Sequence, residues 1–181
     1  MSDFNSLTAS ELGDLIGKGE IDPVELTEQF LSQIELSPIG RKIYSTVTYR
    51  LALEQAKASK KRADIGGRLS SLDGVPISWK DLFDINGHPC EAGSELLAGR
   101  LANKNATVYN FAEAHGLICL GKTHMSELAF SGLGLNPSRE TPPCVNYRES
   151  VPGGSSSGAA TSVSFGLAAA GIGSDTGGSV R

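Results

Sequence analysis

Serine side chains in a glycine-rich setting are the chemically most distinctive feature of this sequence. Ser155 and Ser179 each follow two glycines, in Gly153-Gly-Ser155 and Gly177-Gly-Ser179. A serine hydroxyl is a weak nucleophile and attacks a carbonyl only when a general base takes its proton. The three histidines of the chain all precede these serines, so a lysine is the alternative base.

Lys80 is the candidate for that base. It follows the apolar residues of Val75–Trp79, which predict a short strand that ends at the lysine. A lysine accepts a proton only when it is uncharged, and desolvation or a nearby positive charge lowers its pKa towards neutrality. Taken alone, Lys80 is more typical of a surface lysine than of a base.

An oxyanion produced by serine attack needs hydrogen-bond donors, and the residues before Ser179 offer them. Successive amides around Thr176, Gly177 and Gly178 can point at one oxygen, because the glycines lack a Cβ that would block the approach. The alternative is that Asp175–Gly178 is an ordinary turn after a strand. Both interpretations stay open at this point.

A phosphate-binding loop is a competing interpretation. Gly116–Thr123 fits the pattern G-x-x-x-x-G-K-[ST], in which the middle residues form an open loop of amides around a phosphate. Here those residues are the apolar Leu117–Leu120, which predict a buried strand instead. A phosphate- or nucleotide-binding module with Lys122 as its cation is therefore the disfavoured alternative from another functional class.

A nucleophile elbow is the second competing pattern. Gly154–Gly158 fits G-x-S-x-G with Ser156 as the nucleophile. That motif requires a strand before the serine and a histidine after it. Glu149 and Pro152 make a poor strand, and no histidine follows Ser156. The sequence also lacks H-E-x-x-H and metal-type Cys/His spacing, so no metal site or cofactor is predicted.

Helices that alternate with short buried strands must position these residues, and this alternation predicts an α/β fold. Thr8-Ala-Ser-Glu11 is a capping box, and Asp22-Pro23 predicts another helix start. Further helices are expected over Tyr49–Ala63, Thr107–His115 and Ser156–Phe165, and strands over Val75–Trp79, Leu117–Leu120 and Leu167–Ile172.

Composition excludes several classes of function. The 181 residues carry a net charge of −4 without a basic stripe, so no nucleic-acid partner is predicted. No apolar run is long enough to span a bilayer, so no membrane association is predicted. Three widely spaced cysteines fit a reduced, cytoplasmic protein. A homodimer is left open.

Four segments together resemble the amidase signature family. They are Gly74–Asp84, Gly121–Ser131, Pro152–Ala160 and Gly173–Arg181, and the resemblance runs from the helix capped by Thr8 to the end of the chain. It implies the amidase signature fold, a central mixed sheet flanked by helices. It also implies that Gly121-Lys-Thr123, the end of the phosphate-loop pattern, belongs to a family segment that binds no phosphate.

The resemblance implies a Ser-cisSer-Lys relay. Ser179 corresponds to the nucleophile that forms an acyl-enzyme, and Ser155 to a bridging serine at a cis peptide bond. Lys80 corresponds to the base. An uncharged Lys80 would take a proton through Ser155, and the same relay would then protonate the leaving amine.

The same resemblance assigns the loop around the nucleophile. Thr176, Gly177 and Gly178 correspond to the oxyanion-hole segment, while Asp175 and Arg181 correspond to supports of the loop rather than to reacting groups. His124 stands where relatives often have asparagine, and we interpret it as a polar loop residue.

Two activities within the family fit these residues. The favoured one is a general amidase that hydrolyses a small-molecule carboxylic amide. The alternative is the amidase subunit of a glutamyl-tRNA(Gln) amidotransferase, which usually has glycine where this chain has Ser157. Phe130–Asn136 is also more similar to general amidases. Because family members are two to three times longer, residues 1–181 are expected to be the N-terminal portion of a single amidase signature domain.

Overall fold

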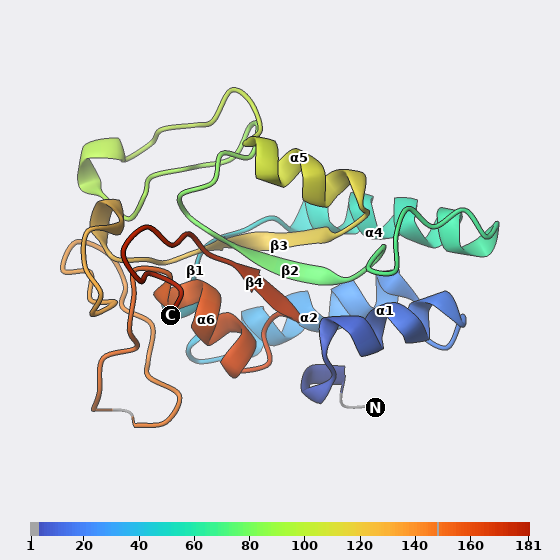
Figure 1. Ribbon diagram of the computed structural model, residues 1–181, viewed down its shortest axis with the longest axis horizontal. Coiled ribbons are helices and arrows are strands. Elements are labelled where there is room, and N and C mark those ends of the chain that lie inside the picture. Colours follow the sequence, from blue (N-terminus) through green and yellow to red (C-terminus); the bar gives the residue numbers. More distant parts are fainter. Residues whose placement is uncertain (1–3, 148) are drawn as a thin grey trace.

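A four-stranded mixed sheet forms the centre of the molecule. The computed structural model describes residues 4–147 and 149–181, and the strand order in the sheet is β1-β3-β2-β4. The strand β2 is parallel to both β3 and β4, and β1 is antiparallel to β3 (Figure 1). The strands are β1 (Tyr44–Val47), β2 (Pro76–Lys80), β3 (Ile118–Thr123) and β4 (Ala170–Ile172). The expected α/β architecture with a central mixed sheet is confirmed.

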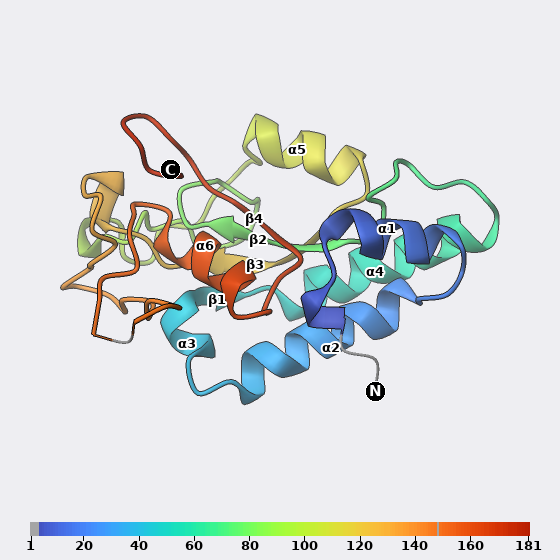
Figure 2. The same ribbon diagram turned by 60° about the horizontal axis from the view of Figure 1, so that its bottom comes forward.

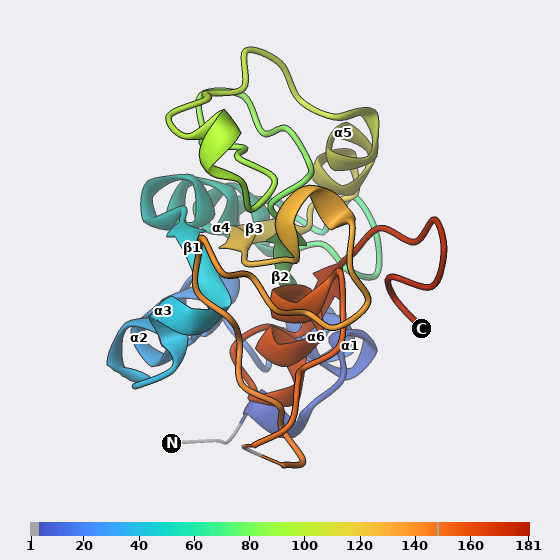
Figure 3. The ribbon, with the colours of Figure 1, turned by 90° about the vertical axis from the view of Figure 1, so that its left-hand side faces the viewer.

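Helices cover both faces of this sheet. Figure 3 shows α5 on one side and α1, α2 and α6 on the other. The helices are α1 (Ala9–Gly17), α2 (Pro23–Leu36), α3 (Gly40–Ile43), α4 (Tyr49–Asp64), α5 (Thr107–Ala114) and α6 (Ser157–Ser164). Short 3-10 helices span Phe4–Ser6, Glu95–Leu97 and Glu127–Ala129.

The N-terminal helices begin at the predicted caps. The Thr8 hydroxyl accepts a hydrogen bond from the Glu11 amide at 3.2 Å, and the Glu11 carboxylate accepts one from the Thr8 amide at 2.7 Å. The Asp22 carboxylate accepts from the Val24 amide at 2.7 Å, with Pro23 as the first helical residue. These side chains satisfy amides that the first turn leaves free, so local sequence alone determines where both helices start.

The central strand β2 separates an aromatic cluster from the polar site. All five of its residues are buried. The Trp79 ring lies 5.6 Å from the Phe83 ring and 5.1 Å from the Tyr109 ring of α5. Since successive side chains of a strand point to opposite faces, Lys80 points away from this cluster, towards the side that carries α6.

The structure contradicts the phosphate-loop interpretation. Ile118–Leu120, where an open loop of amides would be needed, are part of β3, which continues through Gly121 and Lys122 to Thr123. Lys122 is fully buried, and its Nζ donates to Asp81 Oδ1 at 2.9 Å and to the Pro89 carbonyl at 3.1 Å. The glycine and the lysine therefore serve the sheet and its core.

Other elements differ from the sequence-based expectation in length or existence. The predicted strand over Leu167–Ile172 pairs with β2 only over Ala170–Ile172, while Leu167 and Ala168 are buried before it. The elements α3 and β1 were not predicted, because four residues each are too few to show a period. Figure 2 shows the segment after β4 leaving the sheet as a loop.

Candidate active site

Lys80 lies at the end of β2 in a cage of serine hydroxyls. Its Nζ is 2.6 Å from Ser155 Oγ, 2.8 Å from Ser174 Oγ and 3.1 Å from Ser156 Oγ. The side chain is fully buried, which excludes the alternative of a surface lysine. Within residues 4–147 and 149–181, its hydrogen-bond partners are hydroxyls and include no carboxylate.

Burial shifts the protonation equilibrium of this lysine. Desolvation lowers the pKa of Lys80 to about 8, and the negative charge of Asp175 acts in the opposite direction. Desolvation disfavours the charged ammonium form because the protein interior solvates it less well than water does. With a pKa of about 8, about a tenth of the amine is uncharged at pH 7, and the uncharged amine is the form that a general base requires.

Ser155 is held rigidly beside Lys80. The Gly154–Ser155 peptide bond is cis, as the family resemblance implies. The Ser155 carbonyl accepts a hydrogen bond from the Ser126 amide at 3.2 Å, and the residue has no exposed surface. A Cβ on Gly154 would lie 2.7 Å from the Gly134 amide nitrogen, so glycine is needed for the close approach of these two backbone segments.

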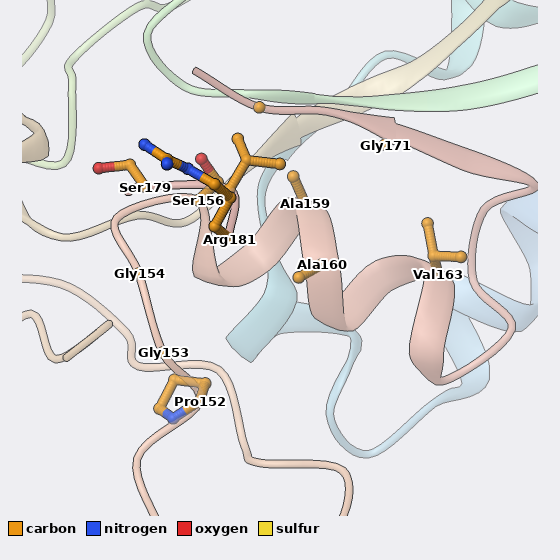
Figure 4. Close-up of a pocket in the computed structure, with 12 residues that line it drawn as sticks. Pro152, Gly153, Gly154, Ser156, Ala159, Ala160, Val163, Gly171, Ser179 and Arg181 are labelled. Atoms are coloured by element: carbon orange, nitrogen blue, oxygen red, sulfur yellow. The ribbon is translucent and has the colours of Figure 1, made fainter. Parts of the chain in front are cut away.

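Ser179 contacts Ser156, the neighbour of Ser155, and its hydroxyl is bonded to neither Lys80 nor Ser155. The Ser179 carbonyl accepts a hydrogen bond from the Ser156 amide at 3.2 Å. Its hydroxyl has no hydrogen-bond partner in the described part of the chain. Ser156 and Ser179 line a cavity of about 280 Å³, bounded by α6 and by the loop that contains Gly154 (Figure 4). The structure thus brings Lys80 and Ser155 together, with Ser179 joined to Ser156 through its backbone.

The loop from Asp175 to Arg181 is organised around one carboxylate. Asp175 accepts hydrogen bonds from the Gly178 amide at 2.7 Å and from Arg181 Nε at 2.9 Å. The Arg181 guanidinium, followed by the Gly178 amide, lowers the pKa of Asp175 to about 2. These contacts tie the Gly178 amide and the Arg181 side chain to Asp175, and the support role of the pair stays a prediction.

That arrangement changes the expected set of oxyanion donors. Because the Gly178 amide already donates to Asp175, it is not free to receive an oxyanion in this structure. The amides of Thr176 and Gly177 have no hydrogen-bond acceptor among the residues that the structure describes, and both residues are exposed.

Sequence reasoning missed two of the hydroxyls around Lys80. Ser156 was considered only as a rival nucleophile, and Ser174 was not singled out. Loop backbone rather than a strand precedes Ser156, so the nucleophile-elbow geometry is absent there. The available signal for both residues was their position beside the two serine motifs, since Ser156 follows Ser155 and Ser174 precedes Asp175.

His124 lies in a loop, as interpreted from the sequence, and its side chain is buried. It follows β3 directly, and burial lowers the pKa of its imidazole. Its carbonyl accepts the Gly158 amide at 2.9 Å, near the start of α6. The described residues contain no group of three or more metal-ligating side chains, and they include no helix that is long and apolar enough to cross a membrane.

Comparisons with known proteins identify the family of this chain. A family model described as Amidase matches residues 25–181. A glutamyl-tRNA(Gln) amidotransferase subunit from Chloroflexus aggregans is 38% identical over 183 residues, which cover 100% of this chain and 37% of that protein. The chain therefore spans little more than a third of the length of such curated relatives.

Solved structures show the same fold. A crystal structure of an amidase superimposes with a TM-score of 0.86 at 29% identity, over 97% of this chain and 40% of that one. The native peptide amidase of Stenotrophomonas maltophilia gives a TM-score of 0.82 at 25% identity, over 91% of this chain and 35% of that one. With the family model covering all but the first 24 residues, the chain belongs to the amidase family, the amidase signature enzymes.

Proposed function

We propose that the full-length protein hydrolyses a carboxylic amide through an acyl-enzyme on Ser179. The contact that carries the proposal is the 2.6 Å distance between Lys80 Nζ and Ser155 Oγ. A buried amine with a lowered pKa, bonded to a hydroxyl instead of a carboxylate, suits a base better than a structural ion pair.

The proposed reaction begins with two coupled proton transfers. Uncharged Lys80 takes the hydroxyl proton of Ser155, and Ser155 takes that of Ser179 as the Ser179 oxygen bonds to the amide carbon. The carbonyl π electrons move to the carbonyl oxygen, which receives hydrogen bonds from the amides of Thr176 and Gly177. One such donor contributes about 3 kcal/mol to stabilising the transition state in comparable sites.

The second half of the reaction reverses the relay. The C–N bond breaks, its electron pair stays with nitrogen, and Lys80 returns the proton through Ser155 to the leaving amine. A water molecule then attacks the ester carbon on Ser179 while the relay takes its proton; the bond between that carbon and the Ser179 oxygen breaks, the relay returns the proton to the Ser179 oxygen, and the acid leaves. The Ser179 backbone is held by the Ser156 amide, and the proposed reaction requires the Ser179 hydroxyl to bond to Ser155.

The substrate class follows from two observations that favour different relatives. Ser157 stands where amidotransferase subunits usually have glycine, which favours a general amidase acting on a small-molecule amide. The 38% identity to an amidotransferase subunit supports a second candidate, the release of ammonia from glutamine for a partner subunit. We propose the general amidase, within a single domain of which residues 1–181 form the N-terminal portion.

Labelling of the full-length protein with a fluorophosphonate probe tests the proposal. We expect the probe on Ser179, loss of labelling in Ser179→Ala, weak labelling in Lys80→Ala and unchanged labelling in the exposed control Ser164→Ala. Labelling at Ser156 would instead support the nucleophile elbow. Hydrolysis of simple amides by the purified protein favours the general amidase, whereas turnover only of glutamine and only with partner subunits favours the second candidate.

A further inference from the structure

All hydrogen-bonding positions of the Ser156 hydroxyl are occupied, so it is not free to act as the nucleophile that its sequence motif suggests. Its Oγ accepts from Lys80 Nζ at 3.1 Å and from the Ser174 amide at 3.3 Å, and it donates to the Ser174 carbonyl at 3.2 Å. A hydroxyl offers one donor and two acceptor positions. All three are used, and the hydroxyl proton points at a carbonyl instead of at the amine.

The backbone of Ser156 joins a second part of the site. Its amide donates to the Ser179 carbonyl at 3.2 Å. Through one side chain and one amide, Ser156 therefore contacts Lys80 and both ends of the loop from Ser174 to Ser179. The residue itself is 5% exposed, so these contacts are largely protected from competing water.

We infer that Ser156 is a positioning residue, which orients the amine of Lys80 and holds the loop of Ser179 against it. This inference rests on the proposed amidase function. An uncharged amine has two N–H groups and one lone pair. With one N–H directed at Ser156 and the other at Ser174, the lone pair faces the hydroxyl of Ser155, which is the nearest of the three at 2.6 Å.

The inference predicts the direction in which the titration of Lys80 moves. An acceptor stabilises a charged ammonium more than a neutral amine, so removing the Ser156 hydroxyl lowers the pKa of Lys80 further. Asp175, paired with Arg181, is the charged group that acts on Lys80 from the described residues, and it stays in place. A purely structural loosening would admit water and move this pKa upwards, towards its ordinary value.

The experiment compares Ser156→Ala and Ser174→Ala with wild type in the full-length protein. We expect Ser156→Ala to lower the maximal kcat by about 10- to 100-fold, as misplacement of reacting groups does, with KM changed by less than about twofold. The ascending limb of its pH–rate profile should move down by about one pH unit. Ser174→Ala should also shift the ascending limb to lower pH. It should reduce kcat less, because the backbone contacts of residue 174 with Ser156 remain.

Ser157→Ala is the matched control. It removes a buried hydroxyl from the next residue, which donates to the His124 carbonyl at 3.4 Å and does not contact Lys80. We expect its kcat and its pH profile to match wild type. Ser156→Cys keeps the shape of the side chain but offers only a weak acceptor. It should shift the ascending limb to lower pH, as expected for Ser156→Ala, and it replaces that variant if Ser156→Ala does not fold.

Two outcomes would overturn the inference. In the first, Ser156→Ala or Ser156→Cys folds and has the kcat and the pH–rate profile of wild type. In the second, the ascending limb of the variant's pH–rate profile moves to higher pH. Failure of the proposed function looks different, because wild type itself would then neither hydrolyse amides nor label with the fluorophosphonate probe.

Discussion

The ammonium group of Lys122 lies 2.9 Å from the carboxylate of Asp81, and both side chains are buried. The pair joins β3 to the residue that follows Lys80, on the face of the sheet away from the serine cage. Burial raises the pKa of Asp81, while the charge of Lys122 acts in the opposite direction. Each charge therefore depends on the other for its compensation in the core.

Lys122→Met should destabilise the full-length protein by about 3–5 kcal/mol at neutral pH, because it leaves an unpaired buried carboxylate. The deficit should shrink as the pH falls, since protonated Asp81 carries no charge. Denaturant unfolding at several pH values measures both effects. The double variant Asp81→Leu/Lys122→Met is the control and should recover most of the loss. A single variant that loses less than about 1 kcal/mol would contradict this assignment.

The pH dependence of amide hydrolysis should report the pKa of Lys80. Since the uncharged amine is the proposed base, kcat/KM should rise about tenfold per pH unit below a pKa of about 8 and level off above it. Lys80→Arg should be inactive, because a guanidinium is not deprotonated in proteins. A plateau that already begins below about pH 6 would be inconsistent with a lysine base.

The lowered pKa of Lys80 should also make the free energy of unfolding increase with pH. The pKa of Lys80 is lower in the folded state than its ordinary value of 10.5, so the unfolded chain binds more protons between about pH 8 and pH 10.5. Wild type should therefore gain on the order of 2 kcal/mol relative to Lys80→Met over that range. Urea unfolding of both proteins at about pH 7.5 and pH 10.5 measures the gain, and a constant difference would refute it.

Asp175 and Arg181 should move the activity profile in opposite directions. Asp175 raises the pKa of Lys80, so Asp175→Asn should shift the ascending limb to lower pH. Arg181→Gln removes the positive charge that balances Asp175, and its limb should shift to higher pH. Both shifts should be a few tenths of a unit and shrink in high salt, because the pair is exposed. Equal shifts in one direction would count against the charge argument.

Gly158 should tolerate no side chain. An added Cβ would lie 2.6 Å from the His124 carbonyl oxygen and 2.8 Å from that of Ile43, and both obstacles are backbone. Gly158→Ala should cost about 2 kcal/mol of stability and reduce activity, because α6 must move together with the serines at its start. Thermal unfolding and amide hydrolysis measure the two effects. Gly67→Ala, whose Cβ meets nothing closer than 3.6 Å, is the control.

Local signals in the sequence predicted much of the fold. The caps at Thr8 and Asp22 were confirmed because a helix start depends on side chains within three residues of it. The strand β3 was predicted too short, since its continuation through Lys122 depends on Asp81, a partner 41 residues away. Sequence periodicity cannot reveal a pair of that separation.

The candidate site was predicted unevenly for the same reason. The adjacency of Lys80 and Ser155 agrees with the family resemblance, although 75 positions separate them. The roles of Ser156 and Ser174 depend on which lone pair or proton each hydroxyl has free, and that is a property of three-dimensional geometry. The placement of Ser179 as nucleophile stays a prediction, since its hydroxyl bonds to neither partner in the described residues.

The strand β2 is paired on both sides, with β3 and with β4, and Lys80 is its last residue. Its backbone should therefore be rigid, with amide hydrogen exchange as slow as global unfolding allows. The amides of Thr176 and Gly177, which have no acceptor in the described structure, should exchange within the dead time of the experiment. The loop around Ser179 would then move to accommodate different substrates, while the base Lys80 keeps a fixed position.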